Sequence, residues 1–175
     1  MSMKQQGAAL VVSMILLVLI TIIGLSSIRS GVMQQKMATN ERDKELSFEA
    51  AETVLRDAEN WLSSQLVEPL PTDDGSTRVW KLNAMDPNDA NPQSWWQERS
   101  QTWWNNNSVS YGVALSNIKT APSSIIEFQY FKSDDLVIGD GGVPNGTVYY
   151  RITGQGTGGT DVARTLLQST TAKRF

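Results

Sequence analysis

Residues 7–28 form an uncharged, strongly apolar run near the start of this 175-residue chain. The run contains 22 residues and is bounded by Lys4 and Arg29. As an α-helix it would extend roughly 33 Å, close to the hydrocarbon thickness of a bilayer at about 30 Å. Its serine and threonine hydroxyls can bond to the helix backbone, so they add little cost in lipid. The run therefore predicts a membrane-spanning helix.

This apolar run is compatible with three kinds of mature protein. It can be a cleaved secretion signal, a permanent single-pass anchor, or an assembly helix preceded by a short leader that is removed. The stretch from Ala8 to Ile23 is longer than a usual signal core of about 7–15 residues, and Gly24-Leu25-Ser26 matches a cleavage site only loosely. The pattern disfavours the secretion signal.

The helical pattern continues beyond the apolar run, because residues 29–66 contain no proline. Small and apolar side chains recur there every three or four residues and predict one buried face: Ala51, Val54, Leu55, Ala58, Trp61, Leu62 and Leu66. Glu52 and Arg56 have the favourable i, i+4 order on the solvent side. Gly24 and Gly31 are candidate points of bending or melting, and Gly24 alternatively permits close helix approach in lipid.

Composition excludes most catalytic and metal-binding classes. The chain has no histidine and no cysteine, which removes imidazole bases, thiolate nucleophiles, disulfides and zinc fingers. Its 15 basic and 18 acidic residues give a net charge of −3, so no basic surface for a phosphate backbone is indicated. We expect a protein that is not an enzyme, with no cofactor or metal and with neither nucleic acid nor a small-molecule substrate as partner.

Residues 67–175 are expected to form a head with an antiparallel sheet. Alternating apolar residues predict three strands, with a possible fourth and a short one at Val79 to Leu82; the four ranges are Ser110–Leu115, Ile125–Phe131, Thr147–Thr153 and Arg164–Thr170. Residues 154–159 predict a hairpin connection. The fold class is α+β, a long helix packed on a small antiparallel sheet.

Two tryptophan pairs are the most unusual local feature of the head. Trp95 and Trp96 follow Ser94, a predicted helix cap, and Trp103 and Trp104 come eight residues later, on roughly the same side of a helix. Tryptophans in such a pattern either fill a small core or form a partner-binding surface. Both interpretations remain open from the sequence.

Acidic loops allow a calcium interpretation at two places. Asp73-Asp74 precedes Gly75, and Asp134-Asp135 lies near Asp140. Neither has the alternating ligand spacing of an EF-hand, and aspartate and glycine are ordinary turn residues. The pattern favours turns.

Several blocks of sequence resemble PilX-type minor pilins of type IV pili. The blocks near the start are Gly7–Val12, Met37–Asp43 and Leu46–Glu52 with Leu55-Arg56; those near the end are Tyr150–Thr153 and Leu167–Thr170. The resemblance implies a ladle-shaped type IV pilin fold. Its parts would be a leader at residues 1–7, a transmembrane and filament-core helix at 8–28, an amphipathic periplasmic continuation at 29–66 and a globular head at 67–175.

The resemblance also implies a processing step and a location. A prepilin peptidase would cut after Gly7, and Ala8 would become the N-methylated first residue. The protein would be single-pass in the bacterial inner membrane with its head in the periplasm, and later at the pilus tip. Major pilins of this kind have glutamate at the fifth mature position, which is Val12 here. That departure suits a subunit at a filament end, and it also resembles the tip pseudopilin of type II secretion.

The function implied by the resemblance is assembly. The protein would join other minor pilins, prime the pilus and sit at its tip, in support of twitching motility, attachment or aggregation. The implied partners are other minor pilins, the major pilin, a large tip adhesin of the PilY/PilC type and the prepilin peptidase. The alternatives are a pseudopilin at the tip of a type II secretion pseudopilus and a membrane-anchored periplasmic receptor.

Overall fold

A single long helix, α1, spans Gln5–Ser64 in the computed structural model. The structure describes residues 5–88, 90–134 and 146–175. The chain divides into two compact units, residues 1–42 and 43–175, and α1 passes from the first to the second. Because α1 ends at Ser64, Leu66 lies beyond the helix and is 96% exposed. The predicted membership of Leu66 in the buried face is therefore wrong.

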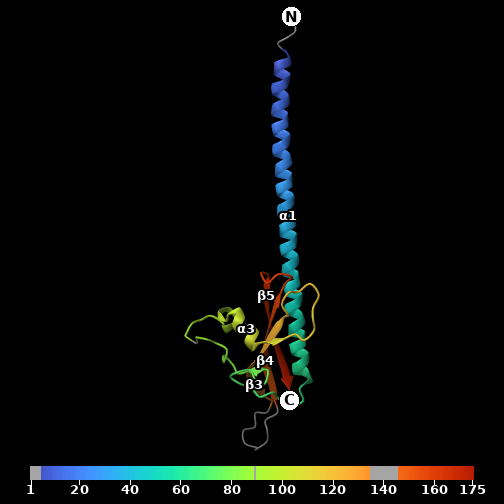
Figure 1. Cartoon of the computed structure of the whole chain (residues 1–175). Coiled ribbons are helices and arrows are strands. Elements are labelled where there is room, and N and C mark those ends of the chain that lie inside the picture. Colours follow the sequence, from blue (N-terminus) through green and yellow to red (C-terminus); the bar gives the residue numbers. More distant parts are fainter. Residues whose placement is uncertain (1–4, 89, 135–145) are drawn as a thin grey trace, which may run out of the picture. The chain divides into compact units, whose positions relative to one another are not determined.

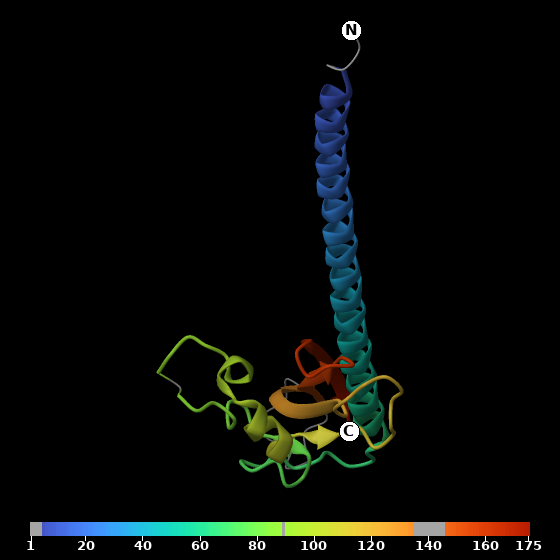
Figure 2. The same cartoon turned by 45° about the horizontal axis from the view of Figure 1, so that its top comes forward.

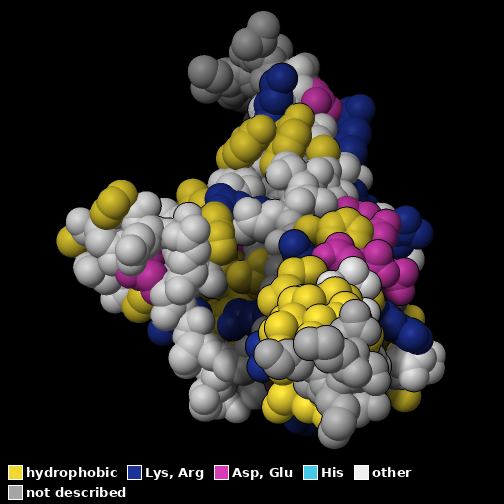
Figure 3. Space-filling view, turned by 90° about the horizontal axis from the view of Figure 1, so that it is seen from above, with side chains coloured by type: hydrophobic (Ala, Val, Ile, Leu, Met, Phe, Trp, Pro, Cys, Tyr) yellow, Lys and Arg dark blue, Asp and Glu magenta, His cyan; other side chains and the backbone are white. Residues whose placement is uncertain are grey.

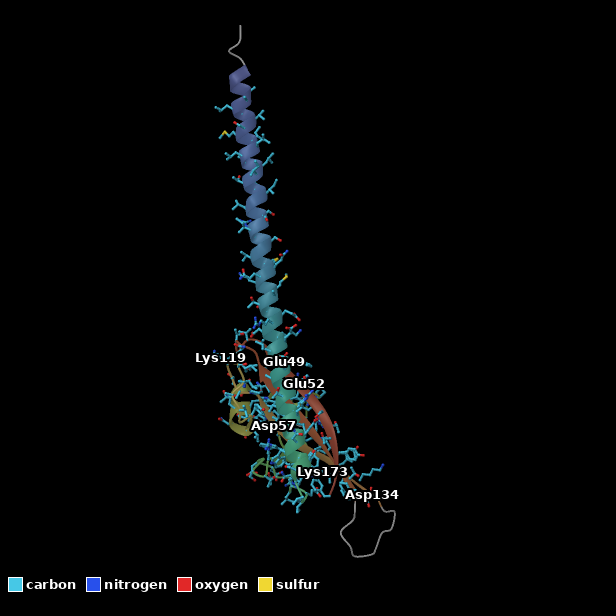
Figure 4. All side chains as sticks on the ribbon, turned by 90° about the vertical axis from the view of Figure 1, so that its right-hand side faces the viewer. Glu49, Glu52, Asp57, Lys119, Asp134 and Lys173 are labelled. Atoms are coloured by element: carbon cyan, nitrogen blue, oxygen red, sulfur yellow. The ribbon has the colours of Figure 1, made fainter. Side chains whose placement is uncertain are left out.

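In the first unit, α1 has no buried residue among those described. Every side chain from Ala8 to Arg42 is exposed, and the side chains stand out all around the helix (Figure 4). The hydroxyls of Ser13 and Thr21 donate to the backbone carbonyls of Leu10 and Val18, at 2.8 and 2.7 Å. These bonds satisfy the hydroxyls inside the helix, as the sequence predicted.

Among its described residues, the second unit is built on a five-stranded mixed sheet. Its strands are β1 (Val79–Trp80), β2 (Val109–Ser110), β3 (Ser123–Ser133), β4 (Gly146–Thr157) and β5 (Arg164–Arg174). The order is β1-β3-β4-β5, with β2 also paired to β3. The three long strands are antiparallel, as predicted, while β1 runs parallel to β3. Figure 1 shows the sheet against the last turns of α1.

Two details of the sheet differ from the sequence prediction. The predicted fourth strand at 110–115 is reduced to Val109–Ser110, and Val113 is 60% exposed with no place in the core. The glycines at 154 and 156 lie inside β4, so the β4–β5 connection covers only 158–163. A Cβ added to Gly156 would meet the Cβ of Ala50 at 2.9 Å, so these glycines serve close packing within a strand rather than a turn.

The face of α1 that lies on the sheet consists mainly of small residues. Its buried positions are Ser47, Ala50, Ala51, Val54, Leu55, Ala58 and Leu62. They cover a core that includes Ile126, Val148, Tyr150 and Ile152 from the two central strands. A Cβ at Gly154 would approach the carbonyl oxygen of Ala51 to 2.9 Å. The predicted face of α1 is confirmed up to Leu62.

The opposite face of the sheet is covered by two short helices, α2 (Trp95–Glu98) and α3 (Gln101–Asn107). Figures 1 and 2 show α3 on the side of the sheet away from α1. Neighbouring strand residues alternate between the two faces: Ile126 packs toward α1, while Ile125 joins a second core with Trp80, Met85, Trp95 and Trp104. The unit is therefore three layers thick.

Candidate assembly segment and its attachment to the head

The candidate functional surface of the first unit is the apolar segment at residues 8–28 of α1. Large side chains on all sides of the helix are about half to two-thirds exposed, from Leu10 at 69% to Ile28 at 65%. Figure 3, which looks down on the helix, shows apolar side chains grouped around it. The helix is long and apolar enough to cross a membrane. A helix that is apolar all round is stable only when lipid or other helices cover it.

The predicted assembly residues all lie on α1. Gly7 lies within the helix, and Ala8 and Val12 are exposed. A Cβ added at Gly24 or Gly31 would meet nothing within 4 Å. The packing of this chain therefore does not require glycine at either position, and the alternatives of helix bending and close approach to another helix both remain.

Polar contacts fix the second part of α1 to β5. The hydroxyls of Ser47 and Thr165 lie 2.7 Å apart, and Ser169 donates to a carboxylate oxygen of Glu59 at 2.7 Å. The ammonium of Lys173 donates to the carbonyl oxygens of Leu62, at 2.8 Å, and Ser63, at 2.9 Å, and also to that of Gln65. Figure 4 shows Lys173 at the end of α1. A cation there satisfies carbonyls that the helix leaves unpaired.

A second attachment lies where α1 enters the head. The carboxylate of Asp43 accepts hydrogen bonds from the backbone N–H of Thr160, at 3.0 Å, and from the Thr160 hydroxyl. These two bonds lower the pKa of the Asp43 carboxyl from 3.8, because they favour its charged form. Sequence reasoning missed both Asp43 and Lys173. For Asp43 the signal is that a resemblance block ends there, and for Lys173 it is a basic residue three positions after the last predicted strand.

The four tryptophans of the two pairs do not share one helix side. Between α2 and α3 the backbone is extended at Arg99 and Ser100, which breaks the expected continuous helix. Ser94 is at the predicted N-cap position but makes no side-chain cap bond, whereas the Ser100 hydroxyl accepts from the Trp103 N–H. The prediction of a single helical side is wrong, because each pair is carried by its own short helix.

The structure separates the tryptophans by burial. Trp95 and Trp104 are 2% and 0% exposed, with ring centroids 5.5 Å apart, and they form the core between the sheet and the short helices. Trp96 and Trp103 are partly exposed, and the guanidiniums of Arg151 and Arg99 lie 5.2 and 4.7 Å from their ring centroids. A partner-binding role remains a prediction for the faces that these two rings present.

The first acidic loop is occupied by internal contacts. Asp73 forms an ion pair with Lys81 at 2.6 Å. Asp74 accepts from the backbone N–H of Ser76 at 3.0 Å, and this bond lowers the pKa of its carboxyl. In the second loop, Asp134 pairs with Arg174 at 2.9 Å, and Asp135 and Asp140 lie outside the described residues. Within the described ranges, no cluster of three or more acidic side chains is arranged to hold a metal ion.

Comparison with protein families accounts for both units. Residues 6–56 match the PilX N-terminal model, and residues 51–173 match the model described as type IV pilus assembly protein PilX C-term. Comparison with curated proteins and with solved structures found no significant match. The two family matches meet within the head segment of α1 and leave only the ends of the chain uncovered. The chain belongs to the PilX family and is a minor pilin, a structural component of type IV pilus assembly.

Proposed function

We propose that this minor pilin is cut after Gly7 by a prepilin peptidase, joins other minor pilins, primes the pilus and occupies its tip. Before assembly, residues 8–28 would hold it in the inner membrane with the head in the periplasm. The observation that carries the proposal is a helix segment that is apolar and exposed on every side, within a chain whose two family matches are to pilus assembly models.

The segment would occupy two environments in succession, lipid before assembly and a bundle of pilin helices afterwards. Both present apolar surface, so a helix that is apolar all round suits each of them. Small residues such as Gly24 and Gly31 would let neighbouring helices approach closely in the bundle, because no atom of this chain occupies the space beside either glycine.

The placement at the tip rests on Val12. A carboxylate at this position would be costly in lipid unless it paired with a cation of a neighbouring subunit. Val12 is 55% exposed and carries no charge, so it offers no such pairing. A subunit without that contact leaves the membrane at lower cost and fits the end of a filament better than its repeating shaft.

Mass spectrometry of the protein from its native membranes tests the processing step. The expected N-terminal peptide begins at a methylated Ala8. A chain that still begins at Met1 would indicate a permanent anchor, and one that begins near Ser27 would indicate a secreted domain. Either result would contradict the proposal.

Labelling of isolated pili tests the position in the filament. An epitope inserted at exposed Val162, in the β4–β5 connection, is expected to place gold particles at pilus ends only. Pili should become rare when the gene is deleted, because priming fails. Label along the whole shaft, or normal pilus numbers without the protein, would contradict tip placement or priming respectively.

A further inference from the structure

A polar groove opens on the face of the head that carries α3. It has two connected parts, with volumes of about 170 and 220 Å³, that share four lining residues from three segments: Gln101, Asn105, Thr120 and Thr157. Gln155 lines the first part, and Arg164 lines the second. The polar groups of the walls are therefore side-chain amides and hydroxyls, with charge at one end.

On the face of the sheet that carries α3, β4 lines the groove with polar side chains. The tryptophan core takes Ile125 from β3 and Leu166 from β5, whereas β4 contributes Gln155 and Thr157, which are 3% and 7% exposed. The Gln155 amide donates to the Gln101 amide oxygen at 2.6 Å. The side-chain amide oxygen of Gln155 has no hydrogen-bond partner among the described residues. A buried amide oxygen costs free energy unless it accepts a hydrogen bond, so Gln155 favours a hydrogen-bond donor at this end of the groove.

The charged end of the groove has a net positive charge. Asp161 is neutralised by Lys119 at 2.7 Å and also accepts from the Thr120 hydroxyl at 2.7 Å. Arg164 lies with its guanidinium 5.9 Å from the Trp104 ring centroid, and no ion pair joins it to an acid within the described ranges. Loss of hydration lowers the pKa of this guanidinium, which nevertheless stays charged. Arg164 is thus available to an anion.

We propose that this groove binds an acidic saccharide, a sugar ring that bears a carboxylate. The carboxylate would bind Arg164, whose planar guanidinium matches carboxylate geometry. The ring hydroxyls would accept from the amide N–H groups that Gln101 and Asn105 do not use in their own bond. They would donate to the hydroxyl oxygens of Thr120 and Thr157, whose protons are already donated within the protein. A ligand with many hydroxyls and one negative charge is complementary to uncharged polar walls with one unpaired cation. The proposal does not depend on the role in pilus assembly.

A nuclear magnetic resonance titration tests this binding. The full chain, labelled with ¹⁵N and held in detergent micelles, is titrated with methyl β-D-glucuronide, with neutral methyl β-D-glucoside and with acetate. The glucuronide is expected to shift the side-chain amide signals of Gln101, Asn105 and Gln155 in a saturable manner. The glucoside should bind roughly tenfold more weakly, the loss expected when a charge-assisted hydrogen bond is absent.

Two variants locate the site, and a third is the matched control. Arg164→Met is expected to remove the preference for the acidic sugar, so that both glycosides bind equally weakly. Asn105→Ala should weaken both ligands, while Asn106→Ala, a change at the exposed neighbour on α3, should leave binding unchanged. Because Asn105 is exposed, its variant should fold even if Arg164→Met disturbs Trp104.

Three results would overturn the proposal. The first is the absence of a saturable shift with the glucuronide. The second is binding of acetate as tight as that of the glucuronide, which would indicate an anion site that does not recognise the sugar ring. The third is a folded Asn105→Ala variant that binds both sugars as the unchanged protein does.

Discussion

The two parts of α1 are one helix in backbone geometry but opposite in what stabilises them. Residues 8–42 are exposed on every side, whereas residues 43–64 bury a face of small side chains against the sheet. Isolated helices are only marginally stable in water, and helices in proteins are stabilised mainly by tertiary packing. The first part must therefore obtain that packing from outside the chain, and the second obtains it from β3, β4 and β5. Each part can be disrupted without the other.

A charge in the first part should have the largest effect. Leu16→Arg is expected to disfavour membrane insertion by about 3–4 kcal/mol, because arginine is costly at the centre of a spanning helix and leucine is favourable. The protein should be lost from extracted membranes and from pili. Glu49→Arg, a change at an exposed position in the second part, is the control and should leave both levels unchanged. Normal membrane levels of the Leu16→Arg variant would contradict the claim that the first part of α1 is stabilised by packing outside the chain.

A larger side chain in β4 should disrupt the packing of the second part of α1 on the sheet. Gly156→Val is expected to cost about 3 kcal/mol of folding free energy, because its side chain would force α1 away from the sheet at Ala50 and Ala51. Tryptophan fluorescence during thermal unfolding of the full chain in detergent measures the loss. Gly112→Ala, where an added Cβ meets nothing within 4 Å, is the control. Equal melting temperatures would show that the close approach is unimportant.

Much of this contrast is readable from the sequence, because it follows from local patterns. The apolar run, the small-residue face up to Leu62 and the three long antiparallel strands all have the periodicity of their element. The glycines of β4 predict a turn, because glycine is a common turn residue and the local sequence does not show that α1 packs against them. The contacts of Asp43 and Lys173 span 117 and 111 residues, and no local pattern specifies such pairs.

Removal of Lys173, the cation of β5 that binds the end of α1, should have a smaller effect on the second part. Lys173→Met is expected to lower folding free energy by about 1–2 kcal/mol, because the carbonyls of Leu62 and Ser63 lose a charged donor. Thermal unfolding of the full chain measures it. Lys132→Met makes the same change at an exposed position of β3 and should cost much less. Equal losses would show that Lys173 acts through general surface charge.

The smallest effect is expected at the junction of the two parts, and it depends on pH. Hydrogen bonds from Thr160 lower the folded-state pKa of Asp43, so the ionised carboxylate stabilises the head above its unfolded pKa, near 3.8. This contribution is lost as pH falls through the lower folded-state value. Asp43→Asn should therefore be less stable than the unchanged protein near neutral pH, and the two melting temperatures should converge in strong acid.

Melting curves of the full chain between about pH 7 and about pH 2 test this convergence. Glu45→Gln, at an exposed position two residues along α1, is the control and should show no such pH-dependent difference. A constant gap between Asp43→Asn and the unchanged protein would assign the effect to a neutral hydrogen bond. A gap that closes in acid would show that an ionised carboxylate holds the 158–163 connection to α1, at the point where the helix passes from external packing to its own sheet.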